Sequence, residues 1–271
     1  MGWSRPPTVA GLFYPDHPET LRGDVEGFLQ AVDPTETTES TGLKAVIAPH
    51  AGYIYSGPVA ASAYARIAPL KGTVRRVVLL GPAHRYPVRG LAAISASAFE
   101  TPLGSIPLDS EFMEKALELE QVQTVDQAHE GEHSLEVHLP FLQVVLGDFT
   151  LVPLVVGDCV PEEVAEALKT LWGGPETLIV ISTDLSHFLP YAQANEIDAK
   201  TARAIQELRP EDISYEQACG RMPTAGLLLR AREEGLQVVC VDLRNSGDTA
   251  GPRHQVVGYG SFILSANTSV C

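Results

Sequence analysis

The chain has 271 residues, of which 45% are hydrophobic and 20% charged, and its formal net charge is −15. An acidic surface of this kind disfavours binding to nucleic acids and to anionic membranes, because both are polyanions. The longest apolar runs, such as TLIVIS, fall far short of the roughly 20 residues that a membrane-spanning helix needs. We therefore expect a protein that binds neither nucleic acid nor membrane.

The N-terminal segment and the cysteines both indicate a reducing compartment. The segment MGWSRPPTVAGLFYP lacks the apolar core and the cleavage site of a signal peptide, so we expect a cytoplasmic protein. The four cysteines, Cys159, Cys219, Cys240 and Cys271, show no CxxC spacing. They do not form a disulfide framework, and a cytoplasm keeps them as thiols.

One low-complexity stretch interrupts the chain. Residues 32–42, VDPTETTESTG, are polar and acidic, which predicts an exposed loop. The chain shows no internal repeat and no second linker. Because its length is common for one α/β domain, we expect residues 1–271 to form a single domain.

Apolar β-branched runs alternate with helix-like segments along the chain. The runs predict strands at residues 45–48, 75–81, 149–157, 176–182, 237–243 and 256–264, and helices are predicted at 56–67, 109–120, 161–172 and 223–235. This alternation predicts an α/β fold with a central, mostly parallel or mixed sheet flanked by helices. The segment FETPLGSIPLD, residues 99–109, has turn residues between two short apolar pieces and predicts an edge hairpin.

Capping signals mark the ends of these predicted helices. Ser56 is the expected N-cap of the first helix, with Pro58 in its first turn. Asp109 opens the second helix, and Pro161 opens the third ahead of acidic residues that suit the helix dipole. Gly235 is the expected C-cap of the fourth.

Three predicted strands end in residues that bind metals or transfer protons. AVIAPH leads to His50, RRVVLLGPAH leads to His84, and LIVISTDLSH leads to Asp184 and His187. Ligands of open α/β sheets bind beyond the carboxyl ends of the strands, so parallel strands would bring these side chains to one crevice. Imidazoles with an anionic ligand are a common donor set for non-haem metals, and the pattern therefore predicts a metal site. The alternative for any one of these histidines is a turn residue bonded to backbone, and the recurrence at three strand ends argues against it.

A fourth segment, HEGEHSLEVHLPFLQ at residues 129–143, is rich in the same residue types. Glu132 and Glu136 are four residues apart, as are His129 and His133, so each pair would share a face of a helix. The run does not match the HExxH zinc motif. A helix N-terminus with acidic residues is the alternative for the whole segment, and His138 has less support than His133.

The cysteines differ in their surroundings. Cys240 lies in the middle of the strand-like run VVCVD and is expected to be a small core residue. Cys219 lies between an acidic segment and the helix-like PTAGLLL, where the positive end of a helix would stabilise a thiolate. A packed structural thiol remains the alternative for Cys219.

Taken together, several stretches resemble the Memo family, also called AmmeMemoRadiSam system protein B. The matching stretches are RPPTVAGLFYP, IAPHAGYIYSG, LLGPAHR, FETPLGSIPLD, EHSLEVHLPFL, LVPLVVGD, STDLSHF and ACGRMP, in order from residue 5 to about 223. SGD and VVGYGSF extend the resemblance almost to the C-terminus. The Memo family is similar in fold to the class III extradiol dioxygenases, in which two histidines and a glutamate hold ferrous iron.

The resemblance implies a role for each candidate residue. His50 and His84 would be metal ligands, and Cys219 would replace the carboxylate of the dioxygenases. His187 would be the acid–base histidine, with Asp184 near it. The remaining residues that the resemblance places at the pocket are His133, Glu132 and Tyr53.

The resemblance also implies cofactors and partners. The expected metal is iron or copper, with zinc as the alternative, because a thiolate is a softer ligand than a carboxylate. The expected partners are an AMMECR-type protein and a radical-SAM protein, with a small-molecule or peptide ligand. We therefore expect a metal-dependent, dioxygenase-like redox protein acting on a small molecule or a partner's side chain. Two alternatives stay open: a non-catalytic module that binds peptides, and a metal-assisted hydrolase in which His187 shuttles the proton.

Overall fold

The structure is a computed structural model that describes residues 2–33 and 42–266. Residues 34–41 of the predicted acidic loop and Cys271 lie outside the described residues. No helix in the described ranges has both the length and the apolar composition needed to cross a bilayer.

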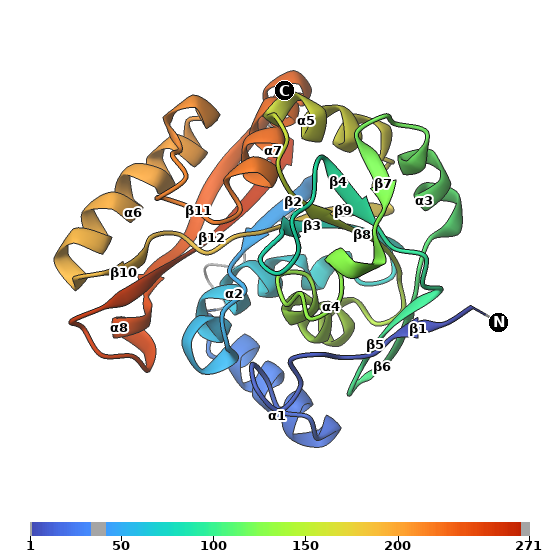
Figure 1. The fold of residues 1–271 in the computed structure, drawn as a ribbon. Coiled ribbons are helices and arrows are strands. Elements are labelled where there is room, and N and C mark those ends of the chain that lie inside the picture. The colour runs from blue at the N-terminus through green and yellow to red at the C-terminus, as the bar shows by residue number, and fades with distance from the viewer. Residues whose placement is uncertain (1, 34–41, 267–271) are drawn as a thin grey trace.

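Figure 1 shows the elements in their spatial arrangement. The strands are β1 (Ser4–Arg5), β2 (Leu43–Ala48), β3 (Arg76–Pro82), β4 (Leu91–Ala93), β5 (Ala98–Thr101), β6 (Gly104–Pro107), β7 (Val122–Thr124), β8 (Thr150–Val156), β9 (Thr177–Ser182), β10 (His187–Leu189), β11 (Leu236–Asn245) and β12 (Val256–Ala266). The α-helices are α1 (Pro18–Gln30), α2 (Tyr53–Ile67), α3 (Ser110–Leu117), α4 (Leu139–Leu146), α5 (Pro161–Thr170), α6 (Tyr191–Gln206), α7 (Arg221–Glu234) and α8 (Ser246–Thr249). Short 3₁₀ turns are η2 (Ala68–Leu70), η3 (Asp126–Ala128), η4 (Glu136–His138) and η5 (Pro210–Asp212).

The described residues form a central mixed sheet of nine strands in the order β10-β12-β2-β9-β3-β8-β4-β7, with β11 paired to β12. The four strands β2, β9, β3 and β8 in its middle run parallel to one another. Towards the edges, β12 is antiparallel to β2 and β4 is antiparallel to β8. The predicted α/β fold with a mixed central sheet is confirmed. Because the parallel strands all end at one edge, the residues that follow them gather there.

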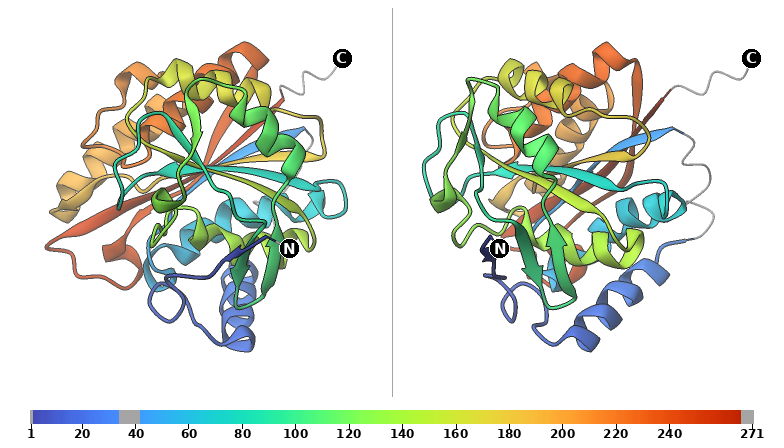
Figure 2. Two further views of the ribbon diagram at one scale, coloured as in Figure 1. Left: turned by 45° about the vertical axis from the view of Figure 1, so that its right-hand side comes forward. Right: turned by 90° about the vertical axis from the view of Figure 1, so that its right-hand side faces the viewer.

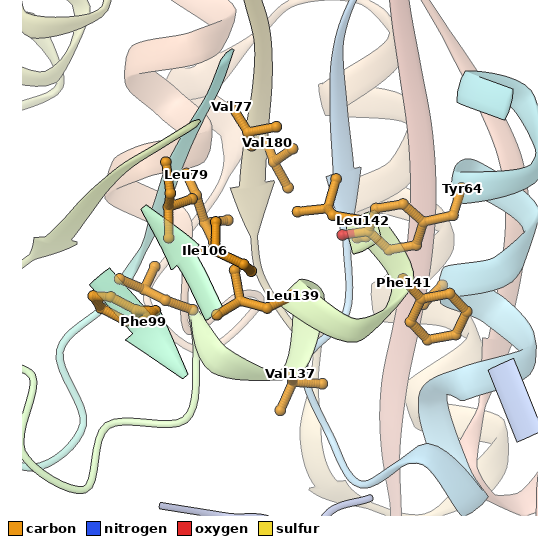
Figure 3. Close-up of a cluster of buried hydrophobic side chains, with 14 of the residues drawn as sticks. Tyr64, Val77, Leu79, Phe99, Ile106, Val137, Leu139, Phe141, Leu142 and Val180 are labelled. Atoms are coloured by element: carbon orange, nitrogen blue, oxygen red, sulfur yellow. The ribbon is translucent and has the colours of Figure 1, made fainter. Parts of the chain in front are cut away.

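Helices cover both faces of the sheet (Figure 2). Alternate residues of each central strand belong to two different buried clusters, so both faces of these strands are apolar. One cluster joins the sheet to α1, α2 and α4, and the other joins it to α3, α5, α6 and α7. Figure 3 shows the first cluster, in which Val77 and Leu79 of β3 and Val180 of β9 lie on the side of Leu139 and Phe141 from α4.

The predicted edge hairpin forms a separate small sheet. β5 and β6 are antiparallel, and β1 near the N-terminus adds to β5 in parallel. The order of this three-stranded sheet is β1-β5-β6. The prediction of a hairpin at residues 99–109 is therefore confirmed, although the hairpin does not extend the central sheet.

Three of the four predicted helix signals are confirmed. The Asp109 side chain accepts a hydrogen bond from the backbone N–H of Phe112, Pro161 is the first residue of α5, and Gly235 ends α7 with a left-handed φ of 65°. The prediction for Ser56 was wrong. The chain turns into α2 directly after Gly52, so Ser56 lies in the first turn, where its hydroxyl donates to the Ala51 carbonyl oxygen.

A buried ion pair attaches the N-terminal segment to the loop that follows η3. The Arg5 guanidinium lies 2.6 Å from the Glu136 carboxylate, and both side chains are almost fully buried. Arg5 also donates to the backbone oxygens of His129 and Glu132. Glu136 accepts a further hydrogen bond of 2.6 Å from the Tyr14 hydroxyl. Arg5 and Glu136 thus attach the N-terminal segment to the loop between η3 and η4, and both charged groups have partners.

Candidate metal centre

His50 lies just beyond β2 with its side chain fixed by β9. Ala48 pairs with Ser182 in the sheet register, and His50 is buried with 1% exposure. The His50 Nδ1 atom lies 2.6 Å from Ser182 Oγ. Because the Ser182 hydroxyl donates to the Ser134 carbonyl oxygen, it must accept from His50 Nδ1–H. This assignment leaves the lone pair on His50 Nε2 available to a metal.

His84 is held by a carboxylate in the same way. It lies beyond β3, and its Nδ1 is 2.9 Å from Glu132 Oε1. Burial alone would raise the pKa of Glu132, but the hydrogen bond and charge of His84 lower this pKa to about 2. An ionised carboxylate only accepts, so His84 Nδ1–H is the donor, and Nε2 is the ring nitrogen left for a metal. A carboxylate behind an imidazole is the usual arrangement for a metal-binding histidine.

Glu132 accepts further hydrogen bonds. The backbone N–H of His84 donates to Oε2 at 2.6 Å, and those of His133 and Ser134 donate to Oε1 at 2.9 Å. Glu132 therefore joins the loop after β3 to the loop after η3. Glu132 also orients the His84 ring through Nδ1. The resemblance had implied only that Glu132 is a pocket residue.

His133 completes a group of three imidazoles. One ligand nitrogen from each of His50, His84 and His133 lies within 4.8 Å of the others. The rings of His84 and His133 stack with centroids 4.7 Å apart, and the ring of His50 lies 5.2 Å and 5.4 Å from them. His133 Nδ1 is buried and forms no hydrogen bond with any described residue. This nitrogen lies 3.5 Å from Glu132 Oε1, and the donor set of three imidazoles fits a transition-metal ion.

The surroundings of His50 and His133 favour their neutral imidazole forms. Burial lowers the pKa of His133 to about 4, with opposing contributions from Glu132 and His84. Burial, followed by the nearby His84 and His133, also lowers the pKa of His50 well below its usual value. Metals bind the neutral form of imidazole, so His50 and His133 are already in the required protonation state at neutral pH.

Cys219 lies beside His50 at the start of α7. Its Sγ is 3.5 Å from His50 Nε2 and accepts a hydrogen bond of 3.3 Å from the Asp184 N–H. Gly220 permits this approach, because a Cβ at this position would lie 2.3 Å from the Ser182 carbonyl oxygen. Burial, together with the charge of Asp184, raises the pKa of the Cys219 thiol to about 12. The thiol is therefore protonated until a cation displaces its proton.

Asp184 and His187 follow β9 but do not bond to each other. Asp184 Oδ1 accepts the backbone N–H of His50 at 2.8 Å, and Oδ2 lies 4.0 Å from His50 Nε2. Burial raises the pKa of Asp184 to about 7. The His187 ring lies 5.9 Å from that of Phe188. Asp184 therefore binds the backbone of His50 and not the side chain of His187.

Several other residues considered in the sequence have hydrogen-bond partners outside the three imidazoles. Tyr53 was expected at the pocket, but it is a core residue whose hydroxyl donates to the Val137 carbonyl oxygen. His129 and His138 are buried and bonded to Ala92 O and to the Tyr64 hydroxyl. Cys240 is only half-buried, because β11 pairs on one side alone.

One positioning residue was missed. Ser182, which orients His50, is the last residue of β9, and no sequence signal distinguishes a strand-end serine that bonds to an imidazole from any other.

Replacing Glu132 with Gln is expected to lower metal affinity by about 10- to 100-fold, the usual effect of losing a carboxylate behind a metal-binding histidine. A Gln side chain still accepts from one N–H but no longer orients His84 with a charge. The measurement is competition with a chromophoric chelator. Glu130→Gln, at an exposed position in the same loop, is the matched control and should keep wild-type affinity. Equal affinities of the two variants would contradict the role of Glu132.

Comparison with known proteins identifies the family of this chain. The sequence model of the family described as "Memo-like protein" matches residues 5–263. A MEMO1 family protein of Aquifex aeolicus is 37% identical over 96% of this chain and 98% of its own, and one of Methanopyrus kandleri is 37% identical over the same shares. A MEMO1 family protein of Ignicoccus hospitalis is 35% identical over 95% of this chain and 97% of its own.

A solved structure shares the fold. The crystal structure of the uncharacterized protein JW3007 from Escherichia coli K12 superposes with a TM-score of 0.55 at 14% identity, covering 82% of this chain and 99% of the other. At this identity the likeness concerns the fold alone. The family match and the relatives cover nearly the whole chain, and the protein therefore belongs to the Memo-like protein family.

Proposed function

We propose that this protein is a metal-dependent redox protein, similar to non-haem dioxygenases, that acts on a small molecule or on a side chain of a partner protein. The observation that carries the proposal is the group of three imidazoles, His50, His84 and His133, at the edge where the parallel strands end. Cys219 lies within reach of His50 as a fourth donor.

The donor set supports iron or copper, with zinc as the alternative. Imidazoles suit all three metals, and a thiolate favours the softer ones. Iron or copper would supply one-electron chemistry, whereas zinc would only polarise water or a carbonyl group. The protein's own part is to fix the orientation of His50 through Ser182 and that of His84 through Glu132.

His187 and Asp184 are the proposed proton-transferring groups. Burial lowers the pKa of His187, which follows Asp184 by three residues and starts β10. The raised pKa of Asp184, about 7, suits a group that takes or gives a proton near neutrality.

Metal analysis of the wild-type protein tests the proposal. Protein purified without added metal is expected to contain iron or copper near one ion per chain, and to consume oxygen when a reductant is supplied. Replacing His187 with Ala should keep the metal content and lower turnover roughly a hundredfold, the usual scale of acid–base assistance. His254→Ala, at an exposed loop position, is the control and should change neither. Zinc alone without oxygen uptake would favour the hydrolase alternative.

A second candidate function, the binding of a peptide, has a separate observation in its favour. Three exposed apolar side chains are next to residues of the centre or of its surroundings. Leu12 precedes Phe13, which packs on His133; Ile54 is the second residue of α2; and Phe188 follows His187. Phe188 keeps its ring exposed with a left-handed φ of 57°, which costs a non-glycine residue free energy. Peptide binding that is equal in the metal-free and metal-loaded protein would favour this module over catalysis.

The partner proteins are proposed from the family resemblance. They are an AMMECR-type protein and a radical-SAM protein, and binding between purified components is the direct test.

A further inference from the structure

A cavity of about 490 Å³ opens beside the candidate centre. The loops that follow β3 and β8 form two of its walls, and the start of α7 forms a third. His84 and Cys219 line its inner end. Its volume lies in the range typical of sites for small organic molecules, so a ligand of that size would reach the centre.

Two arginines line this cavity without a carboxylate partner. Among the ion pairs between described residues, none involves Arg85 or Arg221. The Arg221 guanidinium lies 5.6 Å from the centre of the Tyr215 ring, which orients it. Asp158 is the one carboxylate among the described lining residues. The cavity wall is therefore cationic in a chain whose net charge is −15.

The remaining walls suit the organic part of a ligand. Val88, Met222 and Pro223 are apolar, and the rings of Tyr86 and Tyr215 are partly exposed at the same cavity. Flat and apolar surfaces of this kind bind carbon skeletons, while the arginines provide planar donors that bind carboxylate or phosphate oxygens in pairs. The apolar and aromatic walls together with the two arginines therefore fit a ligand that has both a carbon skeleton and an anionic group.

We infer that this cavity binds a small organic anion, a carboxylate or a phosphate monoester, whose charged group is held by Arg85 and Arg221 while its other end reaches His84 and Cys219. That the anion is the substrate of the centre rests on the proposed function. That the anion binds does not, because the arginines are present whether or not a metal is bound.

Two probes of equal shape and different charge test the binding. Benzoate and benzamide are titrated into the metal-free protein and followed by ligand-detected NMR, and phenyl phosphate is titrated in parallel. Benzoate or phenyl phosphate is expected to bind at least about tenfold more tightly than benzamide, since a charge-assisted pair contributes more than a neutral one. The tighter of the two anions identifies the charged group that the site prefers.

Variants assign the difference to the two arginines. Arg85→Gln and Arg221→Gln should each weaken the preferred anion about tenfold or more and leave benzamide unchanged. Arg89→Gln is the matched control, because Arg89 is an exposed arginine of the same loop that does not line the cavity. Thermal unfolding of all three variants checks that the fold is kept. Equal binding of benzoate, phenyl phosphate and benzamide, or unchanged anion binding in both cavity variants, overturns the inference.

The same titrations separate the two proposals. If the protein takes up no metal but binds the anion through the two arginines, the anion site is supported and the proposed metal function is disproved. If the protein binds metal but binds the anions no more tightly than benzamide, the anion site is disproved and the proposed metal function is not.

Discussion

Replacing His50 or His84 with Ala is expected to lower bound metal at least about tenfold, because each removes one of few ligands and leaves little redundancy. The fold should survive. His84 lies partly exposed at the edge of the sheet, and Glu132 keeps three backbone donors when the imidazole is lost. Elemental analysis of the purified variants gives the metal content, and circular dichroism checks the fold.

Two further variants decide which residue is the third ligand. The distances group His133 with His50 and His84, whereas the family resemblance implies Cys219. If His133→Ala loses metal as His84→Ala does and Cys219→Ala does not, the centre consists of three imidazoles. The opposite result gives a centre of two imidazoles and a thiolate. His254→Ala is the control, and metal content equal to wild type in both His50→Ala and His84→Ala would disprove the site.

Replacing Arg5 with Met is expected to destabilise the protein by about 3–5 kcal/mol, because it leaves the buried Glu136 carboxylate without its cation. The loss is large because neither side chain reaches solvent and Glu136 has no other ion-pair partner among the described residues. Chemical denaturation at neutral pH measures it. Arg22→Met, at an exposed arginine of α1, is the matched control. The double variant Arg5→Met with Glu136→Gln should recover part of the loss, since no unpaired charge remains buried.

The destabilisation by Arg5→Met should shrink as the pH falls. Burial alone would raise the pKa of Glu136, but Arg5 and the Tyr14 hydroxyl lower it below the ordinary value of 4.5. In the wild type, the stabilisation that the ionised Glu136 gives the folded state is present above pH 4.5. It is lost as the pH falls through the lowered pKa of Glu136 in the folded protein. Without Arg5, burial raises the pKa instead, so protonation stabilises the folded variant. A difference between variant and wild type that is constant from pH 7 to about pH 4 would contradict this account.

Much of the fold follows from local patterns in the sequence. Apolar runs of β-branched residues predicted the central strands, and the caps at Asp109, Pro161 and Gly235 predicted helix ends. These signals are local because one turn or one strand contains all the atoms involved. The strand ends at residues 48, 82 and 182 also placed His50, His84 and Asp184 at one edge. That inference needed only the rule that parallel strands end together.

The tertiary structure alone decided the partners of those residues. Asp184 bonds to His50 across 134 residues of sequence, and Arg5 pairs with Glu136 across 131. The four-residue spacings in residues 129–143 predicted shared faces of a helix. The segment instead forms turns and 3₁₀ geometry, so Glu132 contacts His84 and Glu136 contacts Arg5.

The sequence by itself therefore determined the α/β class, the strand ends and the set of histidines available to a metal. The structure decided that Tyr53 packs in the core and that His133 joins His50 and His84. It also decided that Arg85 and Arg221, neither of which forms an ion pair with another described residue, share a cavity with Cys219. The physical reason is that periodicity and capping report the conformation of one element. Contacts between elements depend on sheet register and on close approaches, such as that of Gly220 to Ser182, which arise only when the whole chain is packed.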